Sequence, residues 1–425
     1  MDQTPSKKPS IENKTLEIEY SDNQEHSGCV DFISNMPDDI LCRIISKLPT
    51  KYAIGTSILS IRWKHLFSLI PETFLDFDDS LLLHPTASPP SGLTVPSKER
   101  KTCFVNFMYR VMDVILKDVP TAFKFRLKLN QYYEDYQIID WVLAALVHGV
   151  MWFELVFSLD HASSLFDCLS GWTSVHHLKL ENSIIHAYGS FSLPNLKKLV
   201  INDSVCADED SLPHLLYGSP VLEDLTMHYC YLGELETLNI SIPTLRFLII
   251  EYCYNEAVPY ELVLDTPKLD LLFYQDNVAK GYTVKNLSTL VNAQIYFGEF
   301  DHLWEGDISK YDQNVADLIT GCSSVDSLCI SKASLSVSNL IVGGFVSLDH
   351  LLTCDYNNSR LKKMDFLTIL ILFLQFFYNS GREWPMFCNL KLLQLFGFDT
   401  DGWELLPKII ESAPNLESLD MTEVY

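Results

Sequence analysis

Leucines recur at regular intervals over most of the chain from about residue 120 onward. Three copies of a spacing written leucine-x-x-leucine-x-apolar-x-x-(Asn or Cys) begin at Leu222, Leu245 and Leu269. Each copy is short and alternates apolar with other positions, which is the pattern of a strand with one buried face. Looser copies of the same spacing begin at Val175, Leu196, Val325, Leu390 and Leu416.

The distance between copies indicates how these strands are assembled. The second leucine of successive copies stands at positions 178, 199, 225, 248 and 272, so the steps are 21, 26, 23 and 24 residues. Steps of about 20 to 29 residues are typical of leucine-rich repeats, in which strands too small to bury their own leucines cover one another. Prolines two residues before the first leucine can end the preceding return segment. They are Pro194, Pro220, Pro243, Pro267 and Pro414.

The pattern therefore predicts an α/β fold, with parallel strands lining the concave face of a solenoid and helices and loops outside it. Segments 123–129 and 151–159 read as two earlier strands, joined by a helix near residues 138–148. Between about 279 and 390 the pattern does not define the repeat register. The apolar run 366–378 has 13 residues, fewer than the roughly 20 that span a bilayer, so we expect a buried helix or strand there and no membrane partner.

One polar position recurs inside the repeats. Cys230, Cys253 and Asn277 occupy the slot where a small inward-facing hydrogen-bond donor belongs. A metal or redox pair of stacked cysteines is the alternative. We favour packing, because no histidine or carboxylate occupies that slot beside them and zinc usually needs four gathered ligands. No metal or cofactor is predicted.

Residues 31–77 have a different pattern. Pro37, Asp38 and Asp39 suit a first helical turn, a second helix is expected from about residue 50 to 58, and a third from 62 to 70. Three such short helices cannot bury all their apolar side chains among themselves. We expect the surplus to lie in a groove of a partner protein, although a helical cap packed on the first repeat is an alternative.

The composition of the chain limits the classes of partner that it can bind. The chain of 425 residues has 55 acidic and 31 basic residues, a net charge of -24, which repels nucleic acid and anionic membranes. The net charge therefore disfavours the interpretation of the N-terminal helices as a DNA-binding helix-turn-helix. The N-terminus lacks the apolar core of a secretory signal, and the 11 cysteines form no CxxC. We expect a cytoplasmic or nuclear protein with reduced thiols.

No catalytic motif is present in the sequence. There is no G-x-S-x-G, Walker loop, HExxH or metal-spaced Cys/His cluster. His176 and His177 are adjacent, but neighbours on a strand point to opposite faces and cannot bind one ion. An enzyme hidden in the repeats is the least favoured interpretation, and no catalytic residue is proposed.

The N-terminal segment resembles a known family. The strings "ISNMPDDILCRIISKLPTKYAIGTSILSIRWKHLF" and "LDFDD" closely resemble the F-box of plant F-box proteins that carry leucine-rich repeats, in order and spacing. "FRLKL", the Pro-x-Leu repeats and "GWELLPKIIESAPNLESLDM" extend a weaker likeness. Ile61 stands where a lysine is commoner and Phe67 where a tryptophan is commoner, and both keep or add apolar surface. Members often end in an FBD domain, which we do not find.

The resemblance organises the chain and implies its role. We expect a disordered polar tail (1–30), an F-box (31–77), a Pro/Ser-rich linker (78–100) and a repeat solenoid (101–425). The F-box would dock on the SKP-type adaptor of a cullin-based SCF ubiquitin ligase, whose other subunits perform the ubiquitination chemistry. The implied contacting or contact-supporting residues are Pro37, Ile40, Leu41, Ile44, Leu48, Ile54, Ile58, Leu59 and Trp63.

The repeats would hold an unidentified protein target. Outward strand positions Phe247, Ile249, Leu271 and Phe273 can form one apolar patch because neighbouring strands lie about 4.8 Å apart, flanked by Glu251, Asp276 and Asp224. Exposed patches of this kind mark protein contacts. Coverage of the patch by loops or by the N-terminal helices is the alternative. A ligand-dependent co-receptor and a cullin-independent scaffold are alternative functions on the same architecture.

Overall fold

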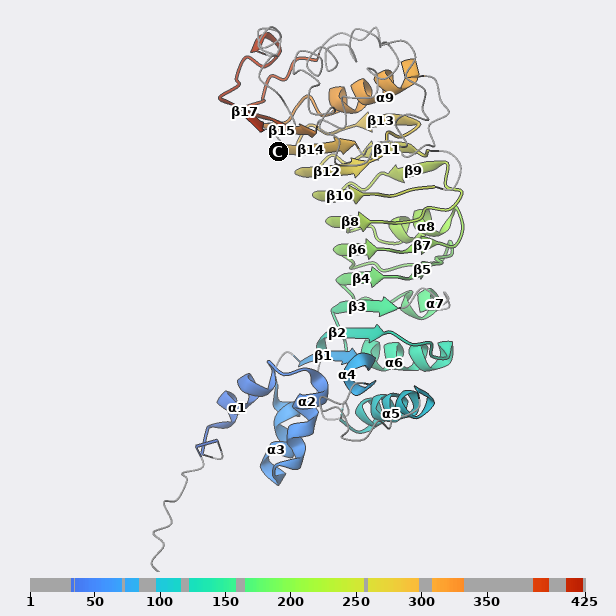
Figure 1. The fold of residues 1–425 in the computed structure, drawn as a ribbon, viewed down its shortest axis with the longest axis vertical. Coiled ribbons are helices and arrows are strands. Elements are labelled where there is room, and N and C mark those ends of the chain that lie inside the picture. Colours follow the sequence, from blue (N-terminus) through green and yellow to red (C-terminus); the bar gives the residue numbers. More distant parts are fainter. Residues whose placement is uncertain are drawn as a thin grey trace, which may run out of the picture.

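A stack of parallel strands dominates the computed structural model of the chain (Figure 1). The described residues are 32–33, 35–70, 73–83, 97–115, 122–157, 165–255, 259–297, 308–331, 385–396 and 410–422. The N-terminal helices lie at one end of the stack, and later repeats follow one another toward the other end. The predicted α/β solenoid after N-terminal helices is confirmed.

Within the described part of the chain, the main sheet has 12 strands in sequence order, each parallel to the next. The strands are β1 (Thr73–Asp78), β2 (Ala122–Leu129), β3 (Trp152–Phe157), β4 (His177–Glu181), β6 (Lys198–Asn202), β8 (Asp224–His228), β10 (Phe247–Glu251), β12 (Leu271–Asp276), β14 (Asn292–Phe297), β15 (Ser327–Ser331), β16 (Leu392–Phe396) and β17 (Ser418–Thr422).

Helices and two smaller parallel sheets form the other layer (Figure 1). One sheet contains β9 (Thr237–Ile240), β11 (Glu261–Asp265) and β13 (Gly281–Lys285), and the other β5 (Ile184–Ile185) and β7 (Val205–Cys206). The helices are α4 (Asp79–Leu83), α5 (Ser97–Arg110), α6 (Asp135–Val147), α7 (Leu165–Leu169), α8 (Ser211–Tyr217) and α9 (Ile308–Gly321), and the π-helical turn η3 (Val111–Ile115) follows α5. The helix expected near 138–148 corresponds to α6.

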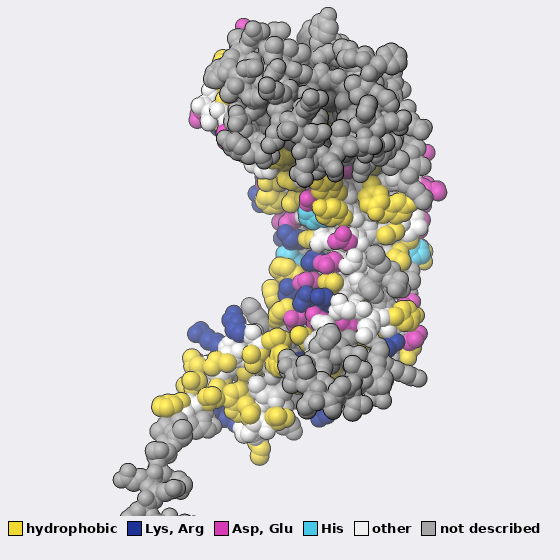
Figure 2. Space-filling model, in the orientation of Figure 1, with side chains coloured by type: hydrophobic (Ala, Val, Ile, Leu, Met, Phe, Trp, Pro, Cys, Tyr) yellow, Lys and Arg dark blue, Asp and Glu magenta, His cyan; other side chains and the backbone are white. Residues whose placement is uncertain are grey.

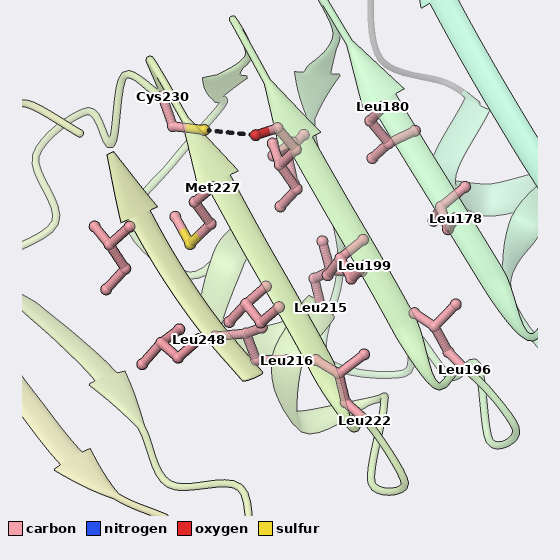
Figure 3. Close-up of a cluster of buried hydrophobic side chains, with 14 of the residues drawn as sticks. Leu178, Leu180, Leu196, Leu199, Leu215, Leu216, Leu222, Met227, Cys230 and Leu248 are labelled. Atoms are coloured by element: carbon pink, nitrogen blue, oxygen red, sulfur yellow. Dashed lines mark hydrogen bonds between the residues drawn. The ribbon is translucent and has the colours of Figure 1, made fainter. Parts of the chain in front are cut away.

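The leucines that define the repeat form the core between these layers. Leu199, Leu225 and Leu248 face one another in register on β6, β8 and β10 and are fully buried. Figure 3 shows such side chains in successive layers between the sheet and α8. A buried leucine stabilises the fold by roughly 1.5–3 kcal/mol, and here the leucines of neighbouring strands lie side by side in the same core.

The recurring polar slot is filled as expected in two repeats. The Cys230 thiol donates to the carbonyl oxygen of Ile201 over 3.4 Å (Figure 3), and the Cys253 thiol to that of Met227 over 3.8 Å. The assignment of Asn277 to this slot was wrong, because Asn277 is exposed. Asp276 is buried instead, and its carboxylate accepts hydrogen bonds from the Cys253 amide and the Tyr260 hydroxyl.

The N-terminal helices are α1 (Asp38–Ile45), α2 (Thr50–Gly55) and α3 (Ile61–Leu66), with 3₁₀ turns η1 (Thr56–Ile58) and η2 (Phe67–Leu69). Pro37 precedes α1, and Asp38 and Asp39 lie in its first turn, as expected. The Arg62 guanidinium on α3 binds the Asp38 carboxylate over 2.6 Å. This ion pair links the beginning of α1 to α3.

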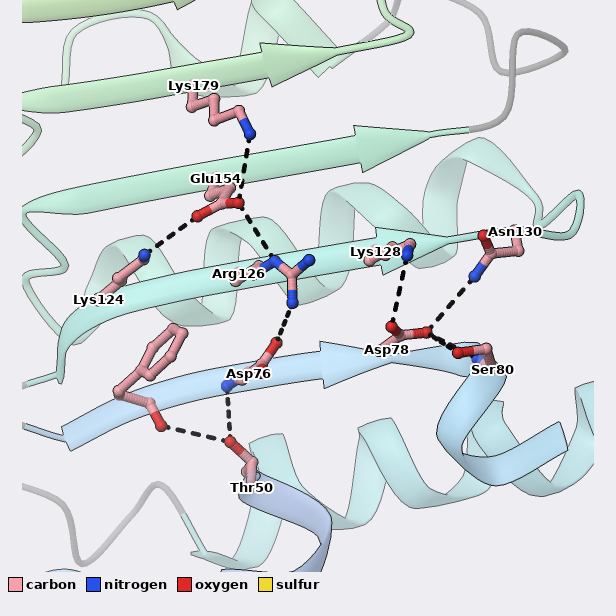
Figure 4. A network of polar contacts seen from close by, with 11 residues as sticks. Thr50, Asp76, Asp78, Ser80, Lys124, Arg126, Lys128, Asn130, Glu154 and Lys179 are labelled. Atoms are coloured by element: carbon pink, nitrogen blue, oxygen red, sulfur yellow. Dashed lines mark hydrogen bonds and ion pairs between the residues drawn. The ribbon is translucent and has the colours of Figure 1, made fainter. Parts of the chain in front are cut away.

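Two side chains of α2 join the N-terminal helices to the start of the solenoid, Thr50 to β1 and Lys51 to α4. The hydroxyl of Thr50, at the start of α2, accepts from the Asp76 amide over 2.6 Å and donates to the Phe74 carbonyl over 3.3 Å (Figure 4). The Lys51 ammonium donates to the Leu81 carbonyl. Because Phe74 and Asp76 belong to β1, residues 73–77, which the sequence placed in the F-box, are also the first strand of the solenoid sheet.

The last aspartate of the "LDFDD" string, Asp79, joins the end of β1 to the segment after β2. We call this contact and the contacts of Thr50 and Lys51 the junction between the N-terminal helices and the solenoid. Asp79 is buried. Its carboxylate accepts from the amides of Asn130 and Gln131 and from the Tyr133 hydroxyl, all beyond the end of β2. Several donors are what a buried carboxylate needs. The string thus supplies both a strand and a polar clamp on the first repeat.

Some expectations fall outside the described residues. They are the polar tail 1–30, the apolar run 366–378 and most of the segment 279–390 beyond Ser331. The range 78–100, expected as a linker, contains α4 and the start of α5.

We predict that replacing Thr50 by valine loosens the junction. The substitution preserves shape but leaves the Asp76 amide and the Phe74 carbonyl without their partner, which should lower the free energy of unfolding by about 1–3 kcal/mol. Urea unfolding and hydrogen exchange at the Asp76 amide measure this. Thr56→Val is the control, because the Thr56 hydroxyl donates within its own helical segment to Ala53. Slow exchange at Asp76 in the Thr50 variant would contradict the assignment.

Asp276 should make stability depend on pH. Burial raises the pKa of its carboxyl from 3.8 to about 7, against the opposing hydrogen bonds from Tyr260, Asn277 and Cys253. A raised folded-state pKa stabilises the fold fully below about pH 4, and this contribution is lost as pH rises toward 7. Asp276→Asn, which stays neutral, should therefore gain stability relative to wild type over that interval, by on the order of 2–4 kcal/mol.

Urea midpoints measured for wild type and Asp276→Asn between pH 4 and 8 test this expectation. The carboxylates elsewhere titrate in both proteins, so the difference between the two curves isolates Asp276. Parallel curves would show that Asp276 titrates normally.

Candidate functional site

Apolar side chains are exposed across the N-terminal helices. Ile58, Leu59 and Ile61 surround the turn between α2 and α3 and are 87%, 63% and 84% exposed. Figure 2 shows hydrophobic side chains spread over this end of the molecule. Several neighbouring side chains exposed to this degree are unusual on a free surface and indicate a protein-binding site.

The predicted adaptor-binding residues divide into two groups. Leu41 and Trp63 are buried between the helices, and Ile54 is half-buried. These three can only support the surface from beneath. The side chains available to a partner, which are exposed, are Pro37, Ile40, Ile44, Leu48, Ile58 and Leu59.

Local structure explains this division. α1 buries Leu41, Cys42 and Ile45 and turns Ile40 and Ile44 outward, as positions three or four apart share one helix face. Ser60 caps α3 by accepting from the Trp63 amide over 3.4 Å, which ends the exposed turn and directs Trp63 into the core. The helices contact β1 through Thr50, yet their outward residues stay uncovered, so capping the first repeat does not account for them.

The predicted contact residues omit part of this surface. Ile61 and Leu69 on α3 and η2, Tyr52 on α2, and Phe32 and Ile33 before α1 are also exposed. Ile61 carried a signal in the sequence, since it replaces a commoner lysine with an apolar side chain. We define the docking surface as Ile40, Ile44, Leu48, Ile58, Leu59 and Ile61.

The outward face of the main sheet changes character along the solenoid. Over β1 to β4 it carries charges of both signs, and Figure 4 shows how they pair. Arg126 lies between Asp76 and Glu154, at 3.2 Å from each. Burial alone would raise the pKa of Glu154, but Lys124, Lys179 and Arg126 lower it below its usual value. The cations in this region are thus neutralised locally and form no patch for nucleic acid.

Over β10 and β12 the outward face is apolar. Phe247 pairs with Leu271, and Ile249 with Phe273, across the two strands, so the structure brings the four predicted target-binding residues together. Phe247 is 38% exposed and the other three are partly exposed. The Phe273 ring lies 5.5 Å from that of Tyr296 on β14, which extends the patch by one strand. We call Phe247, Ile249, Leu271, Phe273 and Tyr296 the apolar patch.

The surroundings of this patch differ in part from expectation. Glu251 does flank it and binds His228 at 2.5 Å, and Asp224 binds Lys198. Asp276 does not flank it, because its carboxylate is turned into the core. The N-terminal helices lie at the far end of the stack (Figure 1) and do not cover the patch.

The histidine pair is not arranged for chemistry. The His177 ring stacks on Trp152 at 4.7 Å, while the His176 ring bonds to the Ser174 carbonyl. In the ranges that the structure describes, no three His, Cys, Asp or Glu side chains gather as a metal site would require. No helix in those ranges is long and apolar enough to cross a membrane.

Comparison with known proteins identifies both regions. Residues 33–74 match the F-box domain, and residues 141–294 match the leucine-rich repeats of the FBD-associated F-box protein At5g56370. The first match covers the docking surface from Ile40 to Ile61, and the second includes the apolar patch apart from Tyr296. Both matches agree with the elements described above.

Whole proteins of Arabidopsis thaliana are similar over nearly the full chain. F-box/LRR-repeat protein At4g14103 is 29% identical over 401 residues, 92% of each chain. F-box/LRR-repeat protein At4g14096 is 29% identical over 92% of this chain and 73% of its own. F-box/FBD/LRR-repeat protein At5g22700 is 27% identical over 92% and 78%. In its F-box match, its repeat match and these relatives, the chain is similar over most of its length to plant F-box/leucine-rich-repeat proteins.

Proposed function

We propose that this protein is the substrate-recognition adaptor of an SCF-type, cullin-based ubiquitin ligase. The observation that carries the proposal is the docking surface, a set of apolar side chains exposed within the matched F-box. A SKP-type adaptor protein is the partner that an F-box implies, and burial in its groove would remove these side chains from water. Ubiquitin transfer itself would be performed by other subunits, so the chain is a non-catalytic subunit.

The solenoid would present the target. The apolar patch lies on the outward face of β10, β12 and β14, several strands from the docking surface, so the two surfaces can be occupied at the same time. Large exposed aromatic and aliphatic side chains are the usual centres of protein interfaces. The patch supports a protein target at this position, in the cytoplasm or nucleus where the ligase would act.

A ligand-dependent co-receptor is the second candidate on the same scaffold, and the described surface gives it less support. An anionic ligand would need unneutralised arginines, but Arg126 on β2 and Arg246, which directly precedes β10, are each bound to carboxylates. A gain in target binding on addition of a small molecule would favour the co-receptor. A scaffold that works without a cullin would be favoured if no SKP-type protein binds.

Replacing Ile58 and Ile61 by serine should weaken binding to a SKP-type adaptor. Both side chains are almost fully exposed, so the fold should be unaffected, while each apolar side chain removed from a buried interface costs about 1–2 kcal/mol of binding free energy. We expect at least about tenfold weaker binding by calorimetry with the purified adaptor. Val147→Ser is the control, since Val147 is an exposed apolar residue on α6. Equal affinities for wild type and both variants would refute the docking surface.

Replacing Ile249 and Phe273 by aspartate should abolish capture of the target and leave adaptor binding intact. Burying an unpaired carboxylate in an interface costs far more than the apolar packing it replaces. Affinity purification with quantitative identification of co-eluting proteins measures both partners together, with Val147→Asp as control. Target proteins that still co-elute with the double variant would show that the patch is not their binding site.

A further inference from the structure

Four residues occupy the left-handed backbone region directly after consecutive strands of the main sheet. They are Asn182, Asp203, Tyr229 and Tyr252, with φ of 52°, 46°, 52° and 50°. Asparagine and aspartate tolerate this region, whereas a bulky side chain there is a genuine outlier. Two successive repeats thus place a disfavoured residue type where earlier repeats place favoured ones. Strain of this kind is found mainly at functional sites.

The two tyrosines are not there to fill the core. Their rings stack with centroids 5.1 Å apart at 18°, and they remain 51% and 36% exposed. The stacking offsets part of the backbone strain but leaves a broad aromatic face toward solvent. The Gln275 side-chain amide donates to the Tyr252 hydroxyl and holds that ring in place.

A second tyrosine pair extends the aromatic surface. Tyr231 and Tyr254 form parallel bridges two residues beyond the first pair, and their rings lie 5.5 Å apart. Tyr254 is more than half exposed. Both pairs come from the ends of β8 and β10, so one edge of the sheet gathers four tyrosines from adjacent repeats.

Two acidic residues lie beside Tyr229: its amide donates to the Glu251 carbonyl over 2.8 Å, and the Asp203 amide donates to the carbonyl of the preceding residue, His228, over 2.9 Å. Loss of hydration raises the pKa of the Tyr229 hydroxyl, and the nearby negative charges of Glu251 and Asp203 raise it further. Glu251 already binds His228. Asp203 is exposed and, in the described part of the chain, has no basic partner. The edge therefore combines flat π faces with negative charge.

We propose that this tyrosine edge, formed by Tyr229, Tyr252, Asp203 and Glu251, binds an arginine side chain of the target protein. A guanidinium stacks on aromatic faces and donates planar hydrogen bonds to carboxylates, so it fits both features at once. A lysine ammonium would satisfy the charge but not the extended stacked face. The proposal rests on the proposed function, since it specifies the chemistry of the target, and the edge adjoins the apolar patch through Glu251 and Gln275.

The test uses the full-length chain and a phage-displayed library of random peptides. We expect the wild-type protein to select arginine-containing peptides. The double variant Tyr229→Asn/Tyr252→Asn, which introduces the residue type that Asn182 supplies at the same position of an earlier repeat, should bind the selected peptides about tenfold more weakly. Asp203→Asn should weaken binding of the selected peptides less than the double variant does. Peptides with lysine in place of the arginine should bind the wild-type protein more weakly. Tyr217→Asn is the matched control, because Tyr217 is an exposed tyrosine on α8.

Thermal unfolding supplies an independent readout. Because asparagine suits the left-handed region, the double variant should unfold at the same or a higher temperature than wild type. Selection of peptides without arginine, undiminished binding to the double variant, or a lower unfolding temperature would each overturn the proposal. Calorimetry with the SKP-type adaptor on the same samples separates the failures: intact adaptor binding without arginine selection rejects the tyrosine edge alone, and absent adaptor binding rejects the proposed function.

Discussion

The parallel register between successive strands is the constraint on which the rest of the structure depends. Each strand buries its leucines against the leucines of its neighbours, so a repeat cannot choose its own register without exposing them. The same register aligns the outward positions into rows along the solenoid. One row begins with Asp76, Arg126 and Glu154 and reaches Ile249 and Phe273. Buried leucines therefore set which surface residues become neighbours.

The first strand gives this constraint a second consequence. β1 belongs to the sheet by pairing with β2, and it belongs to the N-terminal helices through the hydroxyl of Thr50. Asp79 then fastens the chain after β1 to the loop after β2. The α2 contact reaches the sheet directly, through the two hydrogen bonds between Thr50 and β1. A partner on the docking surface and a target on the solenoid would be held at a fixed separation, as transfer of a group from one assembly to the other requires.

The sequence contained enough to predict the repeats, because a period of 21 to 26 residues with buried leucines has few structural solutions. It also located the apolar patch, since alternation on a strand directly determines which residues point outward. The pattern predicted an inward Asn277 and an outward Asp276, and the structure shows the reverse. A shift of one residue at the end of a strand exchanges which of two neighbouring side chains points inward, and the leucine spacing does not reveal that shift. The separation of Leu41 and Trp63 from Ile58 and Leu59 depends on how three helices pack, which the apolar pattern alone leaves open.

The tyrosine edge was missed for a related reason. Tyr229 and Tyr252 stand outside the leucine pattern, and nothing in a sequence marks a residue as left-handed when it is neither glycine nor asparagine. Only the folded backbone reveals that both follow their strands in the same strained conformation. The repeats can tolerate this strain because the turn is held on both sides. The leucine before each tyrosine packs in the core, and the thiol of the cysteine after it donates a hydrogen bond to the preceding strand. The stability of the leucine core therefore permits unfavourable residues directly after the strands. These positions lie outside the core, so a solenoid can vary its surface there.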